Sequence, residues 1–521
     1  MSSTSATRKT APPVIPAGSI SDAVRWRILV VLLVAIFMTL IGVSIVNVAL
    51  PSIQQSLQAS HSDIQWVLSG YALTFGVVLV SAGRAGDIMG RGGIFLLGVL
   101  IFTLSSVAAG LAPDANWLNG ARFVQGIGSG LLNPQGVGMI QQYFRGAERG
   151  RAFGYFGTAV GFSVAVGPVL GGFLIEMGGA DLGWRLTFLV NVPIGILTIV
   201  LGLMWFPKPL ISWEGQPAAH QPRRRHYGLR ALDPVGAILL GLAVLAILFP
   251  FVESRGSPLM WLLLPLGLLL SWLWVRWERH YAARGESPMV DLRIFSTASF
   301  SNGALIMSLY FMGMTSIWVL VALYVQLGNG MSALESGLFG IPAALLSAYA
   351  AHWAGIRVAR YGRSVVIGGL ILALVGMALS ILVVQLAATG AASIWWLVIS
   401  LCFVGLAQGS VISPNQALTL EDVPIDYAGS SGAIMQTGQR IGTSVGIAVI
   451  TAALFGTLNF STWTVAVTIG FTVIMLIIGL ALLVAVKDLR DRNAAVLRAR
   501  KEKMAPAGAT PRQPRRRVGR P

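Results

Sequence analysis

The chain has 521 residues, of which 55% are hydrophobic and only 11% are charged. A soluble domain carries roughly a quarter charged residues, so the composition excludes a soluble enzyme, and the apolar content excludes a disordered chain. The single cysteine, Cys402, excludes a disulfide scaffold. The net charge of +17 does not indicate nucleic-acid binding, because the basic residues lie in short clusters between long apolar runs, as in helical membrane proteins.

Fourteen runs are long and apolar enough to cross a bilayer, which takes about 20 residues of helix. The sequence therefore predicts an all-α polytopic membrane protein with a polar tail at each end, residues 1–26 and the basic residues 487–521. The expected spans are 27–50, 64–84, 93–112, 117–140, 150–175, 184–206, 232–252, 258–277, 297–327, 333–357, 364–386, 393–418, 427–456 and 462–486.

The distribution of Lys and Arg predicts the orientation of these spans. With the N-terminus in the cytoplasm, 33 of the 37 basic residues fall inside and two fall outside, Arg185 and Arg255. Cytoplasmic loops of membrane proteins carry such an excess. We therefore expect both termini to be cytoplasmic, in a bacterial inner membrane.

The last part of the first span contains Gly42, Ser44 and Asn47, and a glycine-rich loop follows the second span. This loop contains Gly83, Asp87, Gly90 and Arg91. Glycines permit a tight turn, and a carboxylate can cap a helix N-terminus and pair with a base across an interface. The loop therefore predicts a latch that holds one conformation, although an ordinary turn with a surface ion pair has the same pattern.

Two later spans carry further motifs. Span 4 contains Arg122 and Gln125, and an arginine within a span is expected to face a cavity or a partner unless it reaches the interface. Span 5 has a run of small residues and a proline, which permit close helix packing and a bend. These residues are Gly161, Gly167, Pro168, Gly171 and Gly172.

The loop after span 2 has a counterpart after span 10. Gly355, Gly362 and Arg363 repeat the spacing of Gly83, Gly90 and Arg91, 272 residues further on. Two similar halves around a central site are a transporter architecture. The predicted division is a half at 27–206, a cytoplasmic linker at 207–231, two inserted helices with a linker at 232–296, and a half at 297–486.

Together these motifs resemble the major facilitator superfamily, and within it the fourteen-span drug:proton antiporters, over residues 27–486. The resemblance implies two six-helix halves plus two inserted helices. It also implies that the loop is the cytoplasmic signature of the superfamily and that the span 5 motif is the one associated with exporters. The implied function is secondary active export of small amphipathic molecules by alternating access, coupled to a proton gradient and without a cofactor.

The sequence departs from the subfamily in span 1, where Gly42 stands at the usual position of an aspartate implicated in proton coupling. All twenty acids lie in loops, tails or span ends, and Glu335 reads as a capping box with Ser332. Arg122 and Arg440 then leave a net positive interior, which favours a neutral or anionic substrate. Candidate substrate or coupling residues are Asn47, Arg122, Gln125, Asn133, Gln135, Tyr310, Asn415, Gln436 and Arg440, and for the neutral ones a helix–helix hydrogen bond is the alternative.

Several functions compete with multidrug efflux. The protein could export one endogenous product such as an antibiotic, lipid or siderophore, act as an uptake facilitator, or be a non-transporting sensor. A membrane-embedded enzyme is disfavoured, since no His, Asp, Glu or Cys cluster lies at one depth, and no phosphate-binding loop indicates direct use of ATP. The expected partners are a small-molecule substrate and membrane lipids, with a monomer as the default state.

Overall fold

The structure is a computed structural model that describes residues 21–211, 232–252, 258–286 and 288–504. The predicted N-terminal tail up to residue 20, residues 212–231 of the linker and the tail from residue 505 lie outside the described residues. Within the described residues every regular element is helical. The fold class predicted from the apolar runs is confirmed.

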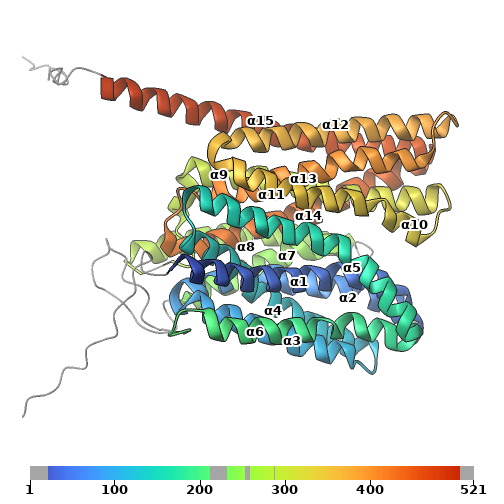
Figure 1. The fold of residues 1–521 in the computed structure, drawn as a ribbon, viewed down its shortest axis with the longest axis horizontal. Helices are drawn as coiled ribbons and strands as arrows, with labels where there is room; N and C mark the ends of the chain where they lie inside the picture. Colours follow the sequence, from blue (N-terminus) through green and yellow to red (C-terminus); the bar gives the residue numbers. More distant parts are fainter. Residues whose placement is uncertain (1–20, 212–231, 253–257, 287, 505–521) are drawn as a thin grey trace, which may run out of the picture.

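The long helices run side by side along one axis (Figure 1). Thirteen described segments are long and apolar enough to cross a membrane, and the long, more polar α4 lies among them. In chain order the helices are α1 (Asp22–Ser56), α2 (His61–Met89), α3 (Arg91–Gly110), α4 (Ala115–Tyr143), α5 (Gly146–Leu189), α6 (Asn191–Trp205), α7 (Pro234–Val252), α8 (Leu263–Ala283), α9 (Ala298–Leu323), α10 (Ala333–Leu338), α11 (Gly340–Tyr361), α12 (Arg363–Ala388), α13 (Leu397–Thr419), α14 (Ala428–Leu458) and α15 (Trp463–Met504).

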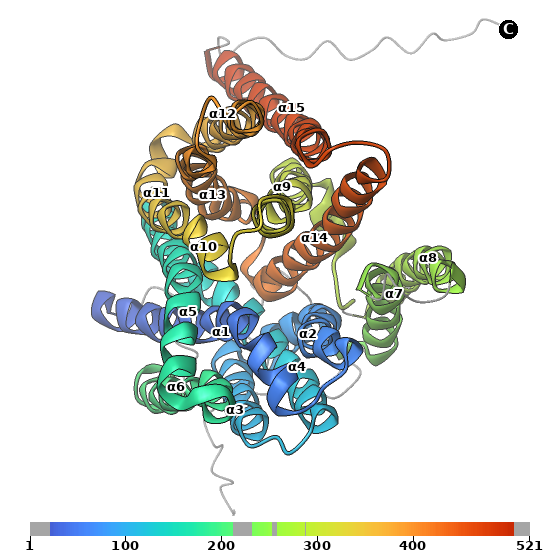
Figure 2. The ribbon, with the colours of Figure 1, turned by 90° about the vertical axis from the view of Figure 1, so that its right-hand side faces the viewer.

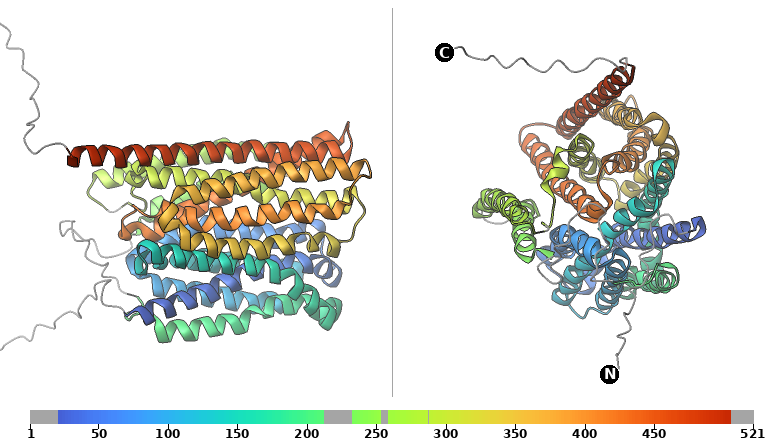
Figure 3. Two further views of the ribbon diagram at one scale, coloured as in Figure 1. Left: turned by 45° about the horizontal axis from the view of Figure 1, so that its top comes forward. Right: turned by 90° about the vertical axis from the view of Figure 1, so that its left-hand side faces the viewer.

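Two helix boundaries differ from the prediction, and a third lies close to it. Two helical parts meet within α5 at Gly179, where φ is 68°, so that the apolar segments Gly146–Gly179 and Asp181–Trp205 correspond to the predicted spans 150–175 and 184–206. The predicted span 333–357 is divided into α10 and α11, and the capping box of Ser332 and Glu335 that opens α10 is confirmed. Helix α15 does not end at residue 486 but continues to Met504, so that it extends beyond the other helices (Figure 3).

The helices form two bundles, α1–α6 and α9–α15, which meet along a seam. Within the bundles α1 packs on α5, α2 and α3 pack on α4, and α11 and α12 pack on α13. Between them α2 and α4 contact α14, while α5 contacts α11 and α13. The end view shows α2 beside α14 and α5 beside α11 at this junction (Figure 2). The seam therefore has two sides, and each is formed by one pair of long helices.

The internal repeat has the same local geometry in both halves. Gly90 and Gly362 precede α3 and α12 with φ values of 105° and 53°, which side chains with a Cβ rarely adopt. Arg91 and Arg363 then open these helices, and both are buried. The glycine at each turn thus sends a basic side chain into the protein rather than toward solvent.

The inserted helices α7 and α8 form a hairpin outside the α2–α14 side of the seam (Figure 2). Helix α7 packs on both α2 and α14. Val244 and Leu248 of α7 form an apolar cluster with Leu73 of α2, and Ile441 of α14 packs against it. The hairpin therefore covers one of the two sides of the seam between the halves.

Candidate functional site

Asp87, near the end of α2, caps α14 of the other half. Its carboxylate accepts hydrogen bonds from the backbone N–H groups of Gly429 and Ser430, each at 2.9 Å, and from the Ser430 hydroxyl at 3.1 Å. The side chain is 1% exposed. Because the first N–H groups of a helix have no partner within it, a carboxylate there is held by hydrogen bonds and by the helix dipole.

Arg91 completes this group of contacts, which we call the latch. It donates to Asp87 at 2.8 Å, to the carbonyl of Ile425 at 2.7 Å and to Gln142. The predicted helix capping by Asp87 is therefore present, and the capped helix lies across the interface. The base that pairs with Asp87 was expected across the interface but comes from its own loop. Across the interface, Asp87 and Arg91 both contact backbone groups around the start of α14.

Close backbone packing surrounds the latch. A Cβ at Gly83 would lie 2.6 Å from the Gly429 carbonyl oxygen, so only glycine lets the two helices approach this closely. Gln141 of α4 adds hydrogen bonds to the carbonyls of Leu420 and Val423, at 2.9 and 3.0 Å. The two halves are thus joined at this end of the bundle, which we call the latch end.

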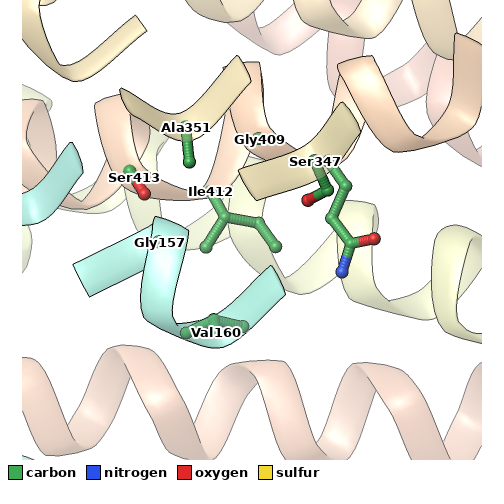
Figure 4. Close-up of a pocket in the computed structure, with 8 residues that line it drawn as sticks. Gly157, Val160, Ser347, Ala351, Gly409, Ile412 and Ser413 are labelled. Atoms are coloured by element: carbon green, nitrogen blue, oxygen red, sulfur yellow. The ribbon is translucent and has the colours of Figure 1, made fainter. Parts of the chain in front are cut away.

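On the other side of the seam α5 and α11 meet through small residues. A Cβ at Gly355 would lie 2.5 Å from the Cα of Gly154 and 2.6 Å from the carbonyl oxygen of Gly150. Further along, a small pocket lies between α5, α11 and α13 (Figure 4). Gly157, Ser347 and Ser413 are among the residues that line it.

The second copy of the loop motif contacts different partners. Arg363 donates to Asp488 of α15 at 2.6 Å and to Asn415 of α13, all within its own half. Arg492 and Asn302 also donate to Asp488, which is 1% exposed. Sequence reasoning placed Asp488 in a polar tail, so it missed this partner. The tail prediction is wrong here because the helix continues and buries the acid.

Arg122 is buried in the N-terminal half rather than exposed at the interface. It is 1% exposed, donates to the carbonyl of Val67 at 2.8 Å and to Gln125, and lies 4.4 Å from the ring centre of Tyr71. Among the described residues it makes no ion pair with a carboxylate. Gly42, at the position where an aspartate was expected, faces Phe102 and Asn191. None of these three residues carries a charge.

Arg440 of α14 faces α2 across the seam. Its guanidinium lies 4.4 Å from the ring centre of Phe75, and no described residue accepts a hydrogen bond from it or forms an ion pair with it. The side chain is half-buried, and Gln436 lies one turn earlier on the same helix. A cation held only by an aromatic face keeps its hydrogen-bonding capacity for another molecule.

The remaining candidate residues divide into two groups. Three of the polar side chains bond to neighbouring backbone: Asn133 to Ser129, Gln135 to Ala82, and Asn415 to Gly303. Gln125 lies between Arg122 and Ser106. By contrast Asn47 is exposed, and the buried Tyr310 hydroxyl has no partner among the described residues. Asn47 and Arg440 are therefore the accessible members of this set, whereas Tyr310 and Gln436 are buried.

The glycines of the span 5 motif pack α5 against two neighbours. A Cβ at Gly161 would lie 2.9 Å from the Ala348 backbone of α11, and one at Gly167 would lie 1.9 Å from the Ser44 hydroxyl of α1. Gly171 likewise faces α1, Gly172 has open space, and Pro168 lies inside the helix. The motif thus places α5 close to both halves.

Four acids among the described residues are buried, although the sequence places all twenty acids in loops, tails or span ends. They are Asp87, Asp488, and a pair formed by Asp233 and Glu278 on the inserted hairpin. The sequence does not reveal this burial, because each acid lies at or beyond the end of an apolar run.

A family model described as Major Facilitator Superfamily matches residues 32–447. The chain belongs to the major facilitator superfamily.

Two curated relatives and one solved structure illustrate this membership. The chain is 33% identical to a probable actinorhodin transporter of Streptomyces coelicolor, over 85% of this chain and 75% of the relative. It is 30% identical to puromycin resistance protein pur8 of Streptomyces alboniger, over 84% and 83%. The human organic anion transporter MFSD10 shares the fold with a TM-score of 0.62 and 14% identity, over 88% of this chain and 99% of that one. This superfamily protein is thus a transporter with relatives in antibiotic and drug export, and not an enzyme.

Proposed function

We propose that this protein exports small amphipathic molecules across the bacterial inner membrane by alternating access, in exchange for protons. Its relatives with names that refer to antibiotic transport or resistance support the direction and the class of substrate. In the proposed orientation both termini and the latch end face the cytoplasm, as the distribution of Lys and Arg favours. No cofactor is required, because the proton gradient supplies the energy.

The latch carries the alternating-access part of this proposal. Asp87 joins α2 to the start of α14, and Gly355 packs against α5 on the other side of the seam. Both contacts join the halves at the latch end. Breaking them lets the halves separate there, and the central residues of α14 become accessible from the cytoplasm.

Arg440 supports a neutral or anionic substrate over a dication. A cation with no carboxylate partner attracts an anionic group and repels a second cation, and the low local dielectric strengthens both effects. Because Gly42 carries no charge, span 1 lacks an acid that would recognise a cation. A second candidate function follows from this charge distribution: the protein exports, or facilitates the passage of, a specific endogenous neutral or anionic product.

Reconstituted protein in liposomes tests both functions. A pH gradient is imposed, and lumenal pH is followed while ethidium, methyl viologen or a carboxylated dye is added. Exchange predicts proton flux that depends on the added compound. Compound movement without proton flux would indicate a facilitator, and strong preference for methyl viologen would contradict the proposed charge selectivity.

A matched pair of variants isolates the role of Arg440. Arg440→Gln should reduce transport of the anionic dye more than that of a neutral compound. Arg145→Gln changes an exposed arginine at the start of α5 and should leave both rates unchanged. Equal loss for both compounds in Arg440→Gln would assign that residue a structural role.

A further inference from the structure

Two buried carboxyl groups lie together on the inserted hairpin. Asp233 immediately precedes α7, Glu278 lies in the last part of α8, and each residue is 1% exposed. A Cβ at Gly236 would lie 2.3 Å from Asp233 Oδ2 and 3.1 Å from Glu278 Oε1. Both carboxyl groups therefore border the same point at the beginning of α7.

The oxygens of this pair are unequally satisfied. Asp233 Oδ1 accepts from the backbone N–H of Gly236 at 3.0 Å and from the Trp277 indole at 2.9 Å. Asp233 Oδ2 and both Glu278 oxygens are buried and make no hydrogen bond of good geometry within the described residues, although the Val290 backbone and the Trp274 indole lie close to Glu278. Burying a carboxylate in this way is costly, so these oxygens indicate a missing hydrogen-bonding group or proton.

Trp274 also borders the pair. It is 8% exposed, and its buried indole N–H makes no hydrogen bond of good geometry within the described residues. It lies one turn before Glu278 on the same face of α8, and its N–H is directed toward the Glu278 carboxyl group. A polar N–H group is therefore oriented toward the acid pair.

The charged groups that face Glu278 are Asp233 from the start of α7 and Arg84 from α2. Arg84 is 6% exposed, and two ionised acids against one base would leave a net negative charge in a water-poor place. A proton on one carboxyl group removes that charge. The protonated group also gains an O–H that can donate to the other carboxylate.

We propose that Asp233 and Glu278 form a proton-binding site that serves the exchange reaction in place of the absent span 1 acid. This inference rests on the proposed proton-coupled function. In the binding step one proton adds to a carboxyl oxygen, and the charge of the pair changes from −2 to −1. Release reverses the step, and no bond to carbon is made or broken.

The site communicates with the latch through the last turns of α2. Arg84 follows Gly83, which packs on the Gly429 backbone, and lies one turn before Asp87, which caps α14. When the pair carries −2, it attracts Arg84 more strongly than when it carries −1. Proton occupancy therefore changes how strongly the hairpin holds the end of α2 that forms the latch.

Infrared difference spectroscopy of the reconstituted protein across a pH titration tests proton binding without any substrate. The wild type should show the C=O stretch of a buried protonated carboxyl group. Either single variant, Asp233→Asn or Glu278→Gln, should lose that band, because a shared proton needs both acids. Asp291→Asn, a control in the segment after α8 where an aspartate pairs with Arg293, should keep the band.

A band that is missing in the wild type would mean that both acids stay ionised beside Arg84. A band that persists in a folded single variant would mean that the proton does not need the pair, and either result would overturn the inference. Transport then separates this inference from the proposed function. Glu278→Gln should retain substrate exchange at equal pH and lose accumulation driven by a pH gradient. If the wild type moves no substrate in exchange for protons, the proposed function fails, whereas the infrared band still decides whether the pair binds a proton.

Discussion

Replacing the latch carboxylate should open the latch end of the bundle. Asp87 accepts two backbone N–H groups of α14 while it also accepts two hydrogen bonds from Arg91. In Asp87→Asn only one side-chain oxygen remains, so an amide N–H must face either Arg91 or the helix N-terminus, and both are donors. The variant therefore loses at least one charge-assisted bond across the seam.

The magnitude follows from these contacts. A hydrogen bond to a charged group contributes about 1.5–3 kcal/mol, and a carboxylate at a helix N-terminus contributes about 0.3–1 kcal/mol more. A loss of about 2–3 kcal/mol lowers the ratio of latched to open protein by roughly 30- to 150-fold, at about 1.4 kcal/mol per factor of ten. The open form should become readily detectable.

Electron–electron distance measurements check this shift. With Cys402→Ser as background, spin labels at Ala23 and Arg490 lie on exposed positions in opposite halves. Asp87→Asn should lengthen the label distance, whereas Asp114→Asn, which alters the exposed cap of α4, should not. A distance distribution in Asp87→Asn that matches the parent would refute the argument that this carboxylate holds the halves together.

Three further substitutions have defined outcomes. Gly355→Val places its Cβ 2.5 Å from the Cα of Gly154 in α5 and should abolish transport in a vesicle assay. The control Gly368→Val, whose Cβ has open space, should keep transport. Asp488→Asn removes one charge of a buried ion pair, and such a loss costs about 3–5 kcal/mol of stability. The midpoint of thermal unfolding should therefore fall in Asp488→Asn, whereas it should stay unchanged in the control Asp491→Asn. Gly42→Asp restores an acid in the N-terminal half, and uptake of methyl viologen into inverted vesicles should rise; an unchanged rate would contradict the charge argument.

The sequence predicts the helices and the helix capping by Asp87, because both depend on local patterns, while the conformational role of the latch stays a prediction. Hydrophobic length sets the spans, and the Gly90–Arg91 and Gly362–Arg363 turns follow from the need for a positive φ before each helix. Asp87 was predicted to cap a helix, since a carboxylate beside a turn commonly does so. What the sequence could not supply was the identity of that helix, because α14 begins more than 300 residues later.

The remaining errors concern burial that arises from distant partners. Asp233 and Glu278 are 45 residues apart, and only the packing of α7 on α8 and α2 brings them beside Arg84. Asp488 lies beyond the last apolar run, and its burial depends on Arg363 of another helix. Hydropathy treats each of these acids as an interfacial residue, since it registers the neighbours in sequence and not those in space.

The hairpin also makes the two sides of the seam unequal toward the surrounding lipid. Helix α7 lies across the junction of α2 and α14, while α5 and α11 meet directly through glycine and alanine. A hydrophobic compound that has partitioned into the bilayer therefore meets the hairpin on one flank and the uncovered junction of α5 and α11 on the other. Recruitment from the leaflet should be one-sided, which gives the transporter a preferred direction of approach within the plane of the membrane.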